Sequence, residues 1–420
     1  MIHVLWYGVQ KRAMLECLIF ITLAGGLLAS KPGMGILNPF QVYFFVWLII
    51  VLGYYLLQSN FISVSFEFLL LMIAAKSFAL FILVCVCVSS KVYTAPQAEI
   101  PDFKLSRVQL VWVLALVGLP FVFQKASYLA DGYSIFSSIG YMRLRAALSS
   151  GVGGYGIASY FLPLALVVSS IELCSYKAGK SSLVRLCLSL FISLAYCYLA
   201  TGRTYVLLLG VLMVSPLIIV KAIELRWVVL LLISFIFMYV FVTAMTVKGV
   251  SFDAGFYENV ATFWLSLQSY VIAPLLAFSI FVEDWSGAEF GLNTFRFFIS
   301  VFYKLGLIDY APAVLVRDYE TVPNPTNVYT VYEVYFRDFW YFGGLLPPLF
   351  LVFHWWLYCR ANKDGGVWVL LYSTSIYPLI LQFFQDQYFS MLSTWIQIVF
   401  WYWFLVVPSH SQKCLEKINA

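Results

Sequence analysis

Residues 39–57 read PFQVYFFVWLIIVLGYYLL, a long apolar run without a charged side chain. The hydrocarbon core of a bilayer is about 30 Å thick, and a helix needs roughly 20 apolar residues to cross it. The run lacks the alternation of a barrel strand, and a helix satisfies its own backbone hydrogen bonds in lipid. The run therefore predicts a membrane-spanning helix.

The composition extends this interpretation to the whole chain. Hydrophobic residues make up 63% of the 420 residues and charged residues 11%, and the mean hydropathy is +0.90. These values exclude an ordinary soluble domain. They predict an all-α, polytopic membrane helix bundle of about 11 (roughly 10–12) transmembrane helices. The predicted spans lie near residues 15–30, 39–57, 66–88, 108–123, 156–174, 183–199, 204–220, 227–247, 339–358, 367–384 and 388–407.

Positive charges in the short loops predict the orientation of the bundle. Most of them fall on one side, which is then cytoplasmic, whereas the opposite short segments hold only Lys11, Arg12 and Arg203. This arrangement places two long polar segments, 124–155 and 248–338, on the outer, periplasmic side. The chain 1–420 is expected to form a single integral membrane domain that carries both segments.

Several classes of function are excluded by what the sequence lacks. The eight cysteines lie in or beside apolar runs or near the C-terminus, so no disulfide framework is expected. Three scattered histidines and the absence of an HExxH pattern predict no metal site. No glycine-rich phosphate loop followed by Lys-Ser/Thr is present, so the chain is not expected to hydrolyse ATP. The net charge of +5 is explained by orientation and needs no nucleic-acid partner.

The first outer segment combines arginines with glycines. Arg143 and Arg145 precede the stretch SSGVGGYG at 149–156. Guanidinium groups bind phosphate oxygens bidentately, and glycine-rich turns expose backbone N–H groups, so the segment is a candidate phosphate or pyrophosphate site. The alternative is a flexible loop whose arginines contact lipid headgroups. In the short turn TGRTY at 201–205, Arg203 is similarly either a ligand for an anionic lipid group or a snorkelling side chain.

The second outer segment contains two stretches with helical character. Residues 259–282 are typical of an interfacial or partly re-entrant stretch. Near 292–305, phenylalanines fall on one helical face while Arg296 and Lys304 share the opposite one. This pattern predicts a helix lying flat at the membrane surface, which either presents Arg296 to a ligand or merely anchors the chain.

Carboxylates and tyrosines follow that stretch. Paired acids serve as general bases, and tyrosine rings stack on sugars. Glu333 and Asp338 are the favoured acids because they adjoin Arg337 where the chain re-enters the membrane; the alternative is that they are simply solvated. The residues concerned are Asp309, Asp318, Glu320, Glu333, Asp338, Tyr329, Tyr332 and Tyr335.

The order of these parts resembles the Wzy-type O-antigen polymerase (oligosaccharide repeat unit polymerase) family. The resemblance rests on TGRT at 201–204, a long late outer segment, NVYT at 327–330 and then Asp338-Phe339. The layout spans nearly the whole chain, whereas the sharp motif covers only about twenty residues. Many relatives read Asp-Phe-Gly where this chain has Asp338-Phe339-Trp340, with glycines only at 343 and 344. The spacing of Arg143 and Gly154 is also similar to one described in some members.

The resemblance implies a metal-independent glycosyltransferase without cofactors in the bacterial inner membrane, with its active site facing the periplasm. Such an enzyme transfers a growing glycan from undecaprenyl pyrophosphate to the non-reducing end of a new undecaprenyl-pyrophosphate-linked repeat unit. Expected partners are these lipid-linked oligosaccharides, membrane lipids, a polysaccharide chain-length regulator and a flippase. The implied pyrophosphate ligands are Arg203 and Arg296, followed by Arg143, Arg145 and Arg337. Asp338 or Glu333 is the implied base, and the implied glycan-binding residues are Asn327, Tyr329 and Tyr332.

Two alternatives remain open at this stage. A lipid-linked oligosaccharide flippase shares the hydrophobicity and the substrate, but we expect its outer loops to be short, unlike 248–338. An O-antigen ligase is the nearest alternative among enzymes.

Overall fold

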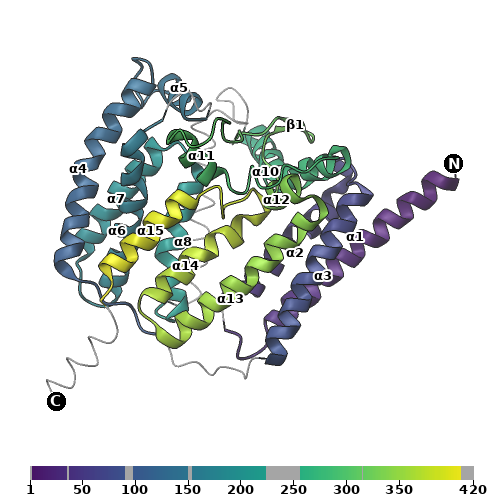
Figure 1. Cartoon of the computed structure of the whole chain (residues 1–420), viewed down its shortest axis with the longest axis horizontal. Coiled ribbons are helices and arrows are strands. Elements are labelled where there is room, and N and C mark those ends of the chain that lie inside the picture. Colours follow the sequence, from purple (N-terminus) through teal and green to yellow (C-terminus); the bar gives the residue numbers. More distant parts are fainter. Residues whose placement is uncertain are drawn as a thin grey trace. The chain divides into compact units, whose positions relative to one another are not determined.

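The computed structural model describes residues 2–35, 37–89, 98–149, 154–223, 256–314 and 316–407. Helices dominate these residues (Figure 1), in agreement with the predicted all-α membrane bundle. The chain divides into two compact units, each assembled from three stretches of sequence. Unit 1 comprises Met1–Thr94, Trp264–Trp356 and Pro378–Leu392, and unit 2 comprises Ala95–Phe263, Leu357–Tyr377 and Ser393–Ala420.

Unit 1 is built on three long apolar helices, α1, α2 and α3, with α1 packed against both of the others. Asn38 fixes the junction of the first two: its side chain accepts from the N–H of Gln41, and its amide donates to the carbonyl of Ala29 at the end of α1 (2.9 Å). Pro39 at the first helical position is pre-organised for the start of α2. The helices are α1 (Ile2–Ala29), α2 (Pro39–Leu57), α3 (Phe66–Ser89), α10 (Phe256–Asp284), α11 (Arg296–Lys304), α12 (Tyr332–Phe339) and α13 (Leu346–Asp364), the ends of α10 and α13 extending into unit 2.

Residues 259–282 of the second outer segment, expected to be interfacial or partly re-entrant, lie within α10, a continuous 29-residue helix with Pro274 inside it. Its middle, including Leu276 and Phe278, is buried in the core of unit 1. The amphipathic helix predicted near 292–305 is present as α11 (Arg296–Lys304), with Ile299 buried and Phe298 and Phe302 exposed.

Between α11 and α12 the chain runs mainly as coil with one short hairpin, β1 (Glu320–Thr321) paired antiparallel with β2 (Pro325–Thr326). After α12, Trp340 adopts φ 53° and ψ −140° and begins the 3₁₀ turn η3 (Trp340–Leu345). This is a backbone conformation that glycine tolerates best, at the position where the Asp-Phe-Gly pattern has glycine. Gly343 is required by a close approach, since a Cβ there would lie 1.9 Å from the backbone oxygen of Tyr335.

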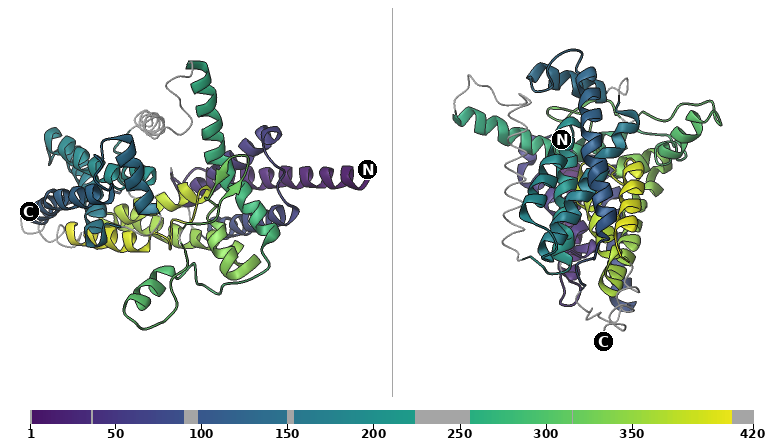
Figure 2. Two further views of the ribbon diagram at one scale, coloured as in Figure 1. Left: turned by 90° about the horizontal axis from the view of Figure 1, so that it is seen from above. Right: turned by 90° about the vertical axis from the view of Figure 1, so that its left-hand side faces the viewer.

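Unit 2 is organised around α6, which packs against α4, α7 and α8. Figure 2 shows these helices running alongside one another. The buried carboxylate of Glu172 in α6 joins three elements by accepting from Trp112 of α4 (2.7 Å) and Arg185 of α7 (2.7 Å). The helices are α4 (Leu105–Leu129), α5 (Ser138–Ser149), α6 (Phe161–Lys177), α7 (Leu183–Leu199), α8 (Arg203–Ile219), α14 (Val367–Ile380) and α15 (Leu392–Leu405), with 3₁₀ turns η1 (Gln58–Asn60), η2 (Gly156–Tyr160) and η4 (Leu381–Phe383) elsewhere in the chain.

Six helical segments of the described chain are long and apolar enough to cross a membrane: Gly8–Ala29, Pro39–Asn60, Phe66–Ser89, Leu105–Leu129, Gly156–Lys177 and Tyr332–Asp364. Four shorter apolar helices coincide with further predicted spans: Leu183–Leu199, Thr204–Ile219, Val367–Phe383 and Leu392–Leu405. The predicted span 227–247 lies outside the described residues, so the count of about 11 stays a prediction.

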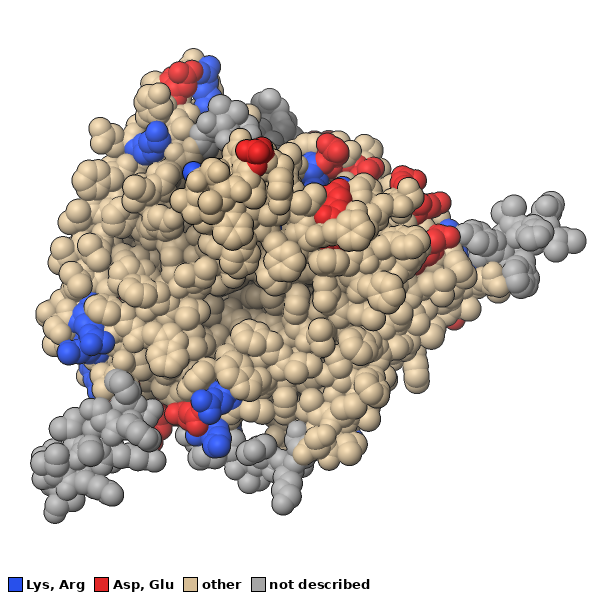
Figure 3. Space-filling model, viewed as in Figure 1, with Lys and Arg blue, Asp and Glu red and all other residues tan. Residues whose placement is uncertain are grey.

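The surface agrees with a lipid environment. Most of the face visible in Figure 3 carries no charged side chain. Large apolar side chains such as Ile49, Phe81 and Phe191 are more than half exposed, which is unfavourable in water and ordinary in lipid. Together with the apolar helices, these exposed side chains indicate a multi-pass membrane protein.

Candidate functional site

A group of arginines and carboxylates lies in unit 1, centred on Glu333 at the start of α12. The Glu333 side chain is only 3% exposed and accepts from Nε of Arg337, one turn later, at 2.7 Å. Nε of Arg317, from the coil before α12, lies 3.1 Å from the same oxygen. Arg337 is also 3.6 Å from Glu289. Glu333 therefore joins two guanidinium groups from different parts of the chain.

Asn293 and Asp338 connect this group to the start of α11. The Asn293 amide donates to Asp338 (2.8 Å) and to Glu289 (2.7 Å), while its oxygen accepts from Arg317 (2.9 Å). Asp338 is fully buried and also accepts from the backbone N–H groups of Asn293 (3.1 Å) and Thr294 (2.6 Å). Its two oxygens thus hold the loop that precedes α11.

Arg296, the first residue of α11, lies close to Arg317. Its Nε donates to the carbonyl of Ala313 (2.6 Å), which is a neutral partner. Burial and the nearby charge of Arg317 lower the pKa of Arg296 below its ordinary value. No described carboxylate lies within ion-pair distance of Arg296. This half-buried cation is therefore left without a counter-charge by the described residues.

Arg296 and Arg317 line a cavity of about 200 Å³ together with Glu333 and the segment 327–330. On this segment, the hydroxyl of Tyr329 donates to the backbone oxygen of Asp318 (3.1 Å), and burial raises the pKa of Tyr329 to about 12. The hydroxyl of Thr330 is buried and has no hydrogen-bond partner among the described residues. The cavity is thus lined by two arginines, two carboxylates (Glu333 and Asp386) and several hydroxyl and amide groups.

Asp386 also lines this cavity and was not identified from the sequence. It accepts from the hydroxyl of Tyr335 (2.7 Å), from both the backbone N–H (2.9 Å) and the hydroxyl (2.7 Å) of Ser390, and from the N–H of Tyr388 (3.0 Å). No sequence signal singled it out, because it falls between two predicted spans, 367–384 and 388–407.

Arg317 was also missed as a site residue. It lies in a coil with no helical periodicity, so the sequence assigned it no face. The available signal was its position between Arg296 and Arg337 in the same outer segment.

The structure places the predicted site residues in four groups. Arg296, Glu333, Asn327 and Tyr329 line the cavity. Arg337 and Asp338 lie behind it and contact the residues that line it.

Tyr332 points into the core of unit 1 and does not line the cavity. Its hydroxyl bonds to Tyr43 (2.7 Å) and to Nζ of Lys76 (2.9 Å), which is fully buried.

The remaining predicted arginines belong to unit 2. Arg143 on α5 pairs with the exposed Asp131 and lies over the ring of Tyr133 at 4.3 Å. Arg145 is half-buried on the same helix. Arg203 begins α8, but its side chain lies outside the described residues. Among the described residues, no group of three His, Cys, Asp or Glu side chains could hold a metal ion.

Comparison with known proteins gives one relevant similarity. A protein of Escherichia coli (strain K12) named "Putative O-antigen polymerase" is 27% identical over 136 residues. The alignment covers 31% of this chain and 33% of that protein, so about a third of each is compared. No family model and no solved structure matches the chain. The similarity agrees with the resemblance noted in the sequence and suggests a role in O-antigen polymerisation.

Proposed function

We propose that this protein polymerises lipid-linked oligosaccharide repeat units of O-antigen or a related surface polysaccharide. It transfers the growing glycan from undecaprenyl pyrophosphate to the non-reducing end of a new undecaprenyl-pyrophosphate-linked repeat unit. The reaction takes place on the periplasmic side of the bacterial inner membrane. Support comes from the polymerase named above, from the apolar helical architecture and from the cavity in unit 1.

The observation that carries the proposal is the uncompensated charge of Arg296. Keeping a half-buried guanidinium without a counter-charge is costly, and a bound anion offsets that cost. Arg317 adds a second cation in the same cavity. Arginine forks match phosphate oxygens, so the pyrophosphate of the lipid carrier fits against Arg296, while Arg317 is already paired with Glu333. Because the arginines supply the positive charge, the proposed chemistry needs no metal.

The proposed step balances with the residues of the cavity. The acceptor sugar hydroxyl attacks the anomeric carbon of the donor glycan, and the bond from that carbon to the pyrophosphate oxygen breaks. The bonding electrons leave with the pyrophosphate, where Arg296 and Arg317 stabilise the developing charge. The hydroxyl proton passes to Glu333, because the side chain of Glu333 lines the cavity whereas Asp338 does not.

The other predicted residues keep proposed roles in this scheme. Asn327 and Tyr329 orient the glycan at the mouth of the cavity. Two lipid pyrophosphates take part in each transfer, and Arg143, Arg145 and Arg203 of unit 2 are candidate ligands for the second.

The experiment is a gel analysis of surface polysaccharide in cells that lack this protein. The intact chain, Arg296→Ala and Arg317→Ala are returned separately, and membrane abundance is quantified for each. Arg12→Ala is the matched control, because Arg12 is an exposed arginine of the same unit paired with one acid.

We expect the null strain to show a single repeat unit on the lipid core. The intact chain and Arg12→Ala should restore the ladder, whereas loss of one stabilising cation should slow polymerisation about 10²–10³-fold. A null strain with core alone and no repeat unit contradicts the proposal and favours a flippase or a ligase. Normal ladders from both Arg296→Ala and Arg317→Ala contradict the assignment of this cavity as the pyrophosphate site.

A further inference from the structure

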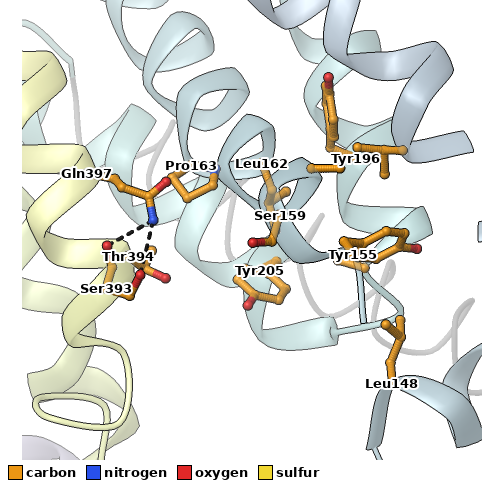
Figure 4. A pocket seen from close by; sticks show the side chains of 13 residues that line it. Leu148, Tyr155, Ser159, Leu162, Pro163, Tyr196, Tyr205, Ser393, Thr394 and Gln397 are labelled. Atoms are coloured by element: carbon orange, nitrogen blue, oxygen red, sulfur yellow. Dashed lines mark hydrogen bonds between the residues drawn. The ribbon is translucent and has the colours of Figure 1, made fainter. Parts of the chain in front are cut away.

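A second cavity, of about 320 Å³, lies within unit 2 and has a different lining. Its walls come from α4, α5, α6, α7, α8, α15 and the turn η2, and none of the described residues that line it is charged. Figure 4 shows Ser159 beside Tyr205, with Tyr155 on one side and the group from α15 on the other. The polar side chains of the lining are Tyr155, Ser159, Tyr196, Tyr205, Ser393, Thr394 and Gln397.

Two of the three tyrosines that line this cavity, Tyr155 and Tyr196, are held in place through their hydroxyls. Tyr196 donates to the backbone oxygen of Ala115 (2.8 Å), and Tyr155 donates to that of Leu199. Because each hydroxyl is tied to the backbone, the ring orientations are fixed. The lining therefore includes preset aromatic surfaces.

Gln397 on α15 lines this cavity and carries an acceptor to which no described residue donates. Its amide nitrogen donates to the backbone oxygen (2.9 Å) and the hydroxyl (3.3 Å) of Ser393, which fixes the side chain (Figure 4). Its carbonyl oxygen is buried and has no hydrogen-bond partner among the described residues. A buried acceptor of this kind is costly unless a ligand donates to it.

We propose that this cavity binds a neutral sugar residue of the glycan. A pyranose ring has apolar C–H faces that stack on aromatic rings and a rim of hydroxyls that both donate and accept. The uncharged lining suits such a ligand and gives a pyrophosphate nothing to pair with. The seven polar side chains likewise do not suit a polyprenyl tail. The volume falls at the lower end of the range for small-molecule sites, about 300–1,000 Å³.

The assignment of the sugar to the surface glycan rests on the proposed polymerase function. It also gives a role to the end of the stretch SSGVGGYG, which the sequence analysis associated with phosphate. The described end of that stretch contributes Tyr155 to the wall, and Ser159 follows in η2. In this position the stretch contacts the sugar, and arginines outside this cavity bind the phosphate.

The test measures binding of a delipidated repeat-unit oligosaccharide to the purified full-length chain in nanodiscs. The probe is released from the cell's own surface polysaccharide and carries no phosphate. Saturation-transfer NMR with titration gives the dissociation constant for the intact chain, Gln397→Leu and Ser159→Ala. Gln41→Leu is the matched control, since Gln41 also bonds a serine hydroxyl but lies in unit 1. Thermal unfolding of each variant reports whether it is folded.

We expect Gln397→Leu to weaken binding about tenfold, as for loss of one buried acceptor, with Gln41→Leu unchanged. Absence of binding to the intact chain, or equal binding by folded Gln397→Leu and Ser159→Ala, overturns the inference. Displacement of the probe from the intact chain by sugar-free undecaprenyl phosphate shows a lipid site and also overturns it. The binding assay requires no glycan transfer, so failure of the polymerase proposal in the ladder assay is separable from failure here.

Discussion

Replacing Glu333 with glutamine tests the central contact of the candidate site. The substitution keeps the shape of the side chain but removes the charge that Arg317 and Arg337 share at 3.1 and 2.7 Å. Removing one partner from a fully buried ion pair costs roughly 3–5 kcal/mol. Each arginine is 17% exposed, and Glu289 lies 3.6 Å from Arg337, so part of this cost is relieved. We expect the free energy of unfolding to fall by about 2–4 kcal/mol.

The assay is unfolding by SDS titration in mixed micelles, followed by tryptophan fluorescence. Glu16→Gln is the matched control, because Glu16 pairs with Arg12 on an exposed surface and should leave the unfolding free energy unchanged. A fall of less than about 0.5 kcal/mol for Glu333→Gln refutes the conclusion that Glu333 neutralises two arginines. The ladder assay tests the other proposed role of Glu333, that of proton acceptor. If Glu333 accepts the proton, Glu333→Gln should lose the polysaccharide ladder even when its membrane abundance is normal.

Three further predictions concern single side chains. Lys76→Met should have a free energy of unfolding at least as large as that of the wild type, because it replaces a buried amine that no described carboxylate pairs with. Lys76→Ala should lower the free energy of unfolding by about 2–4 kcal/mol because it leaves a cavity. Equal losses in the two variants contradict this prediction. Trp340→Gly should stabilise the protein by about 1 kcal/mol in the same titration, because φ is 53° and the ring is 48% exposed. The pKa of Tyr329 is raised to about 12, so its contribution to stability is complete below pH 10 and lost as the pH rises toward 12. The melting temperature of Tyr329→Phe should therefore depend less on pH between about 10 and 12 than that of the wild type. Identical pH profiles of the two proteins contradict the burial of the Tyr329 hydroxyl.

Hydropathy predicted the bounds of several helices closely. The predicted spans 39–57 and 183–199 coincide with α2 (Pro39–Leu57) and α7 (Leu183–Leu199). In these segments the lipid sets the pattern, and the pattern is local. Residues 259–282, expected to be interfacial or partly re-entrant, lie in one continuous helix whose buried residues contact distant helices, and a local pattern does not contain those contacts.

The start of the last long span shows the same limit. Sequence placed it at 339, whereas the helical run begins at Tyr332. A hydropathy window scores each charged residue separately, so it excludes Glu333, Arg337 and Asp338 from a membrane span. In the fold they are neutralised by one another and by residues 289–317. A hydropathy window along the sequence cannot include these interaction partners, because they are too far away in the chain.

Some residues of the candidate site could be selected from the sequence by the charge of their side chains alone. Arg296 and Glu333 were chosen for their charge, and the cavity brings them together with Asn327 and Tyr329. Arg317 was passed over because coil has no periodicity from which to infer a facing side chain. Nothing in the sequence indicated the surroundings of Lys76, because its aromatic neighbours come from α2 and α12.

The two arginines of the cavity divide their hydrogen-bonding capacity differently. Arg317 donates from Nε to Glu333, from Nη1 to Val314 (3.1 Å) and from Nη2 to Asn293 (2.9 Å), so all three nitrogens are engaged. Arg296 uses only Nε among its contacts with the described residues. A guanidinium has five N–H groups, so the fork of Arg296 keeps both Nη groups for a planar anion. We infer that Arg317 mainly fixes the geometry and the field of the cavity, and that Arg296 makes the direct bidentate contact with the pyrophosphate.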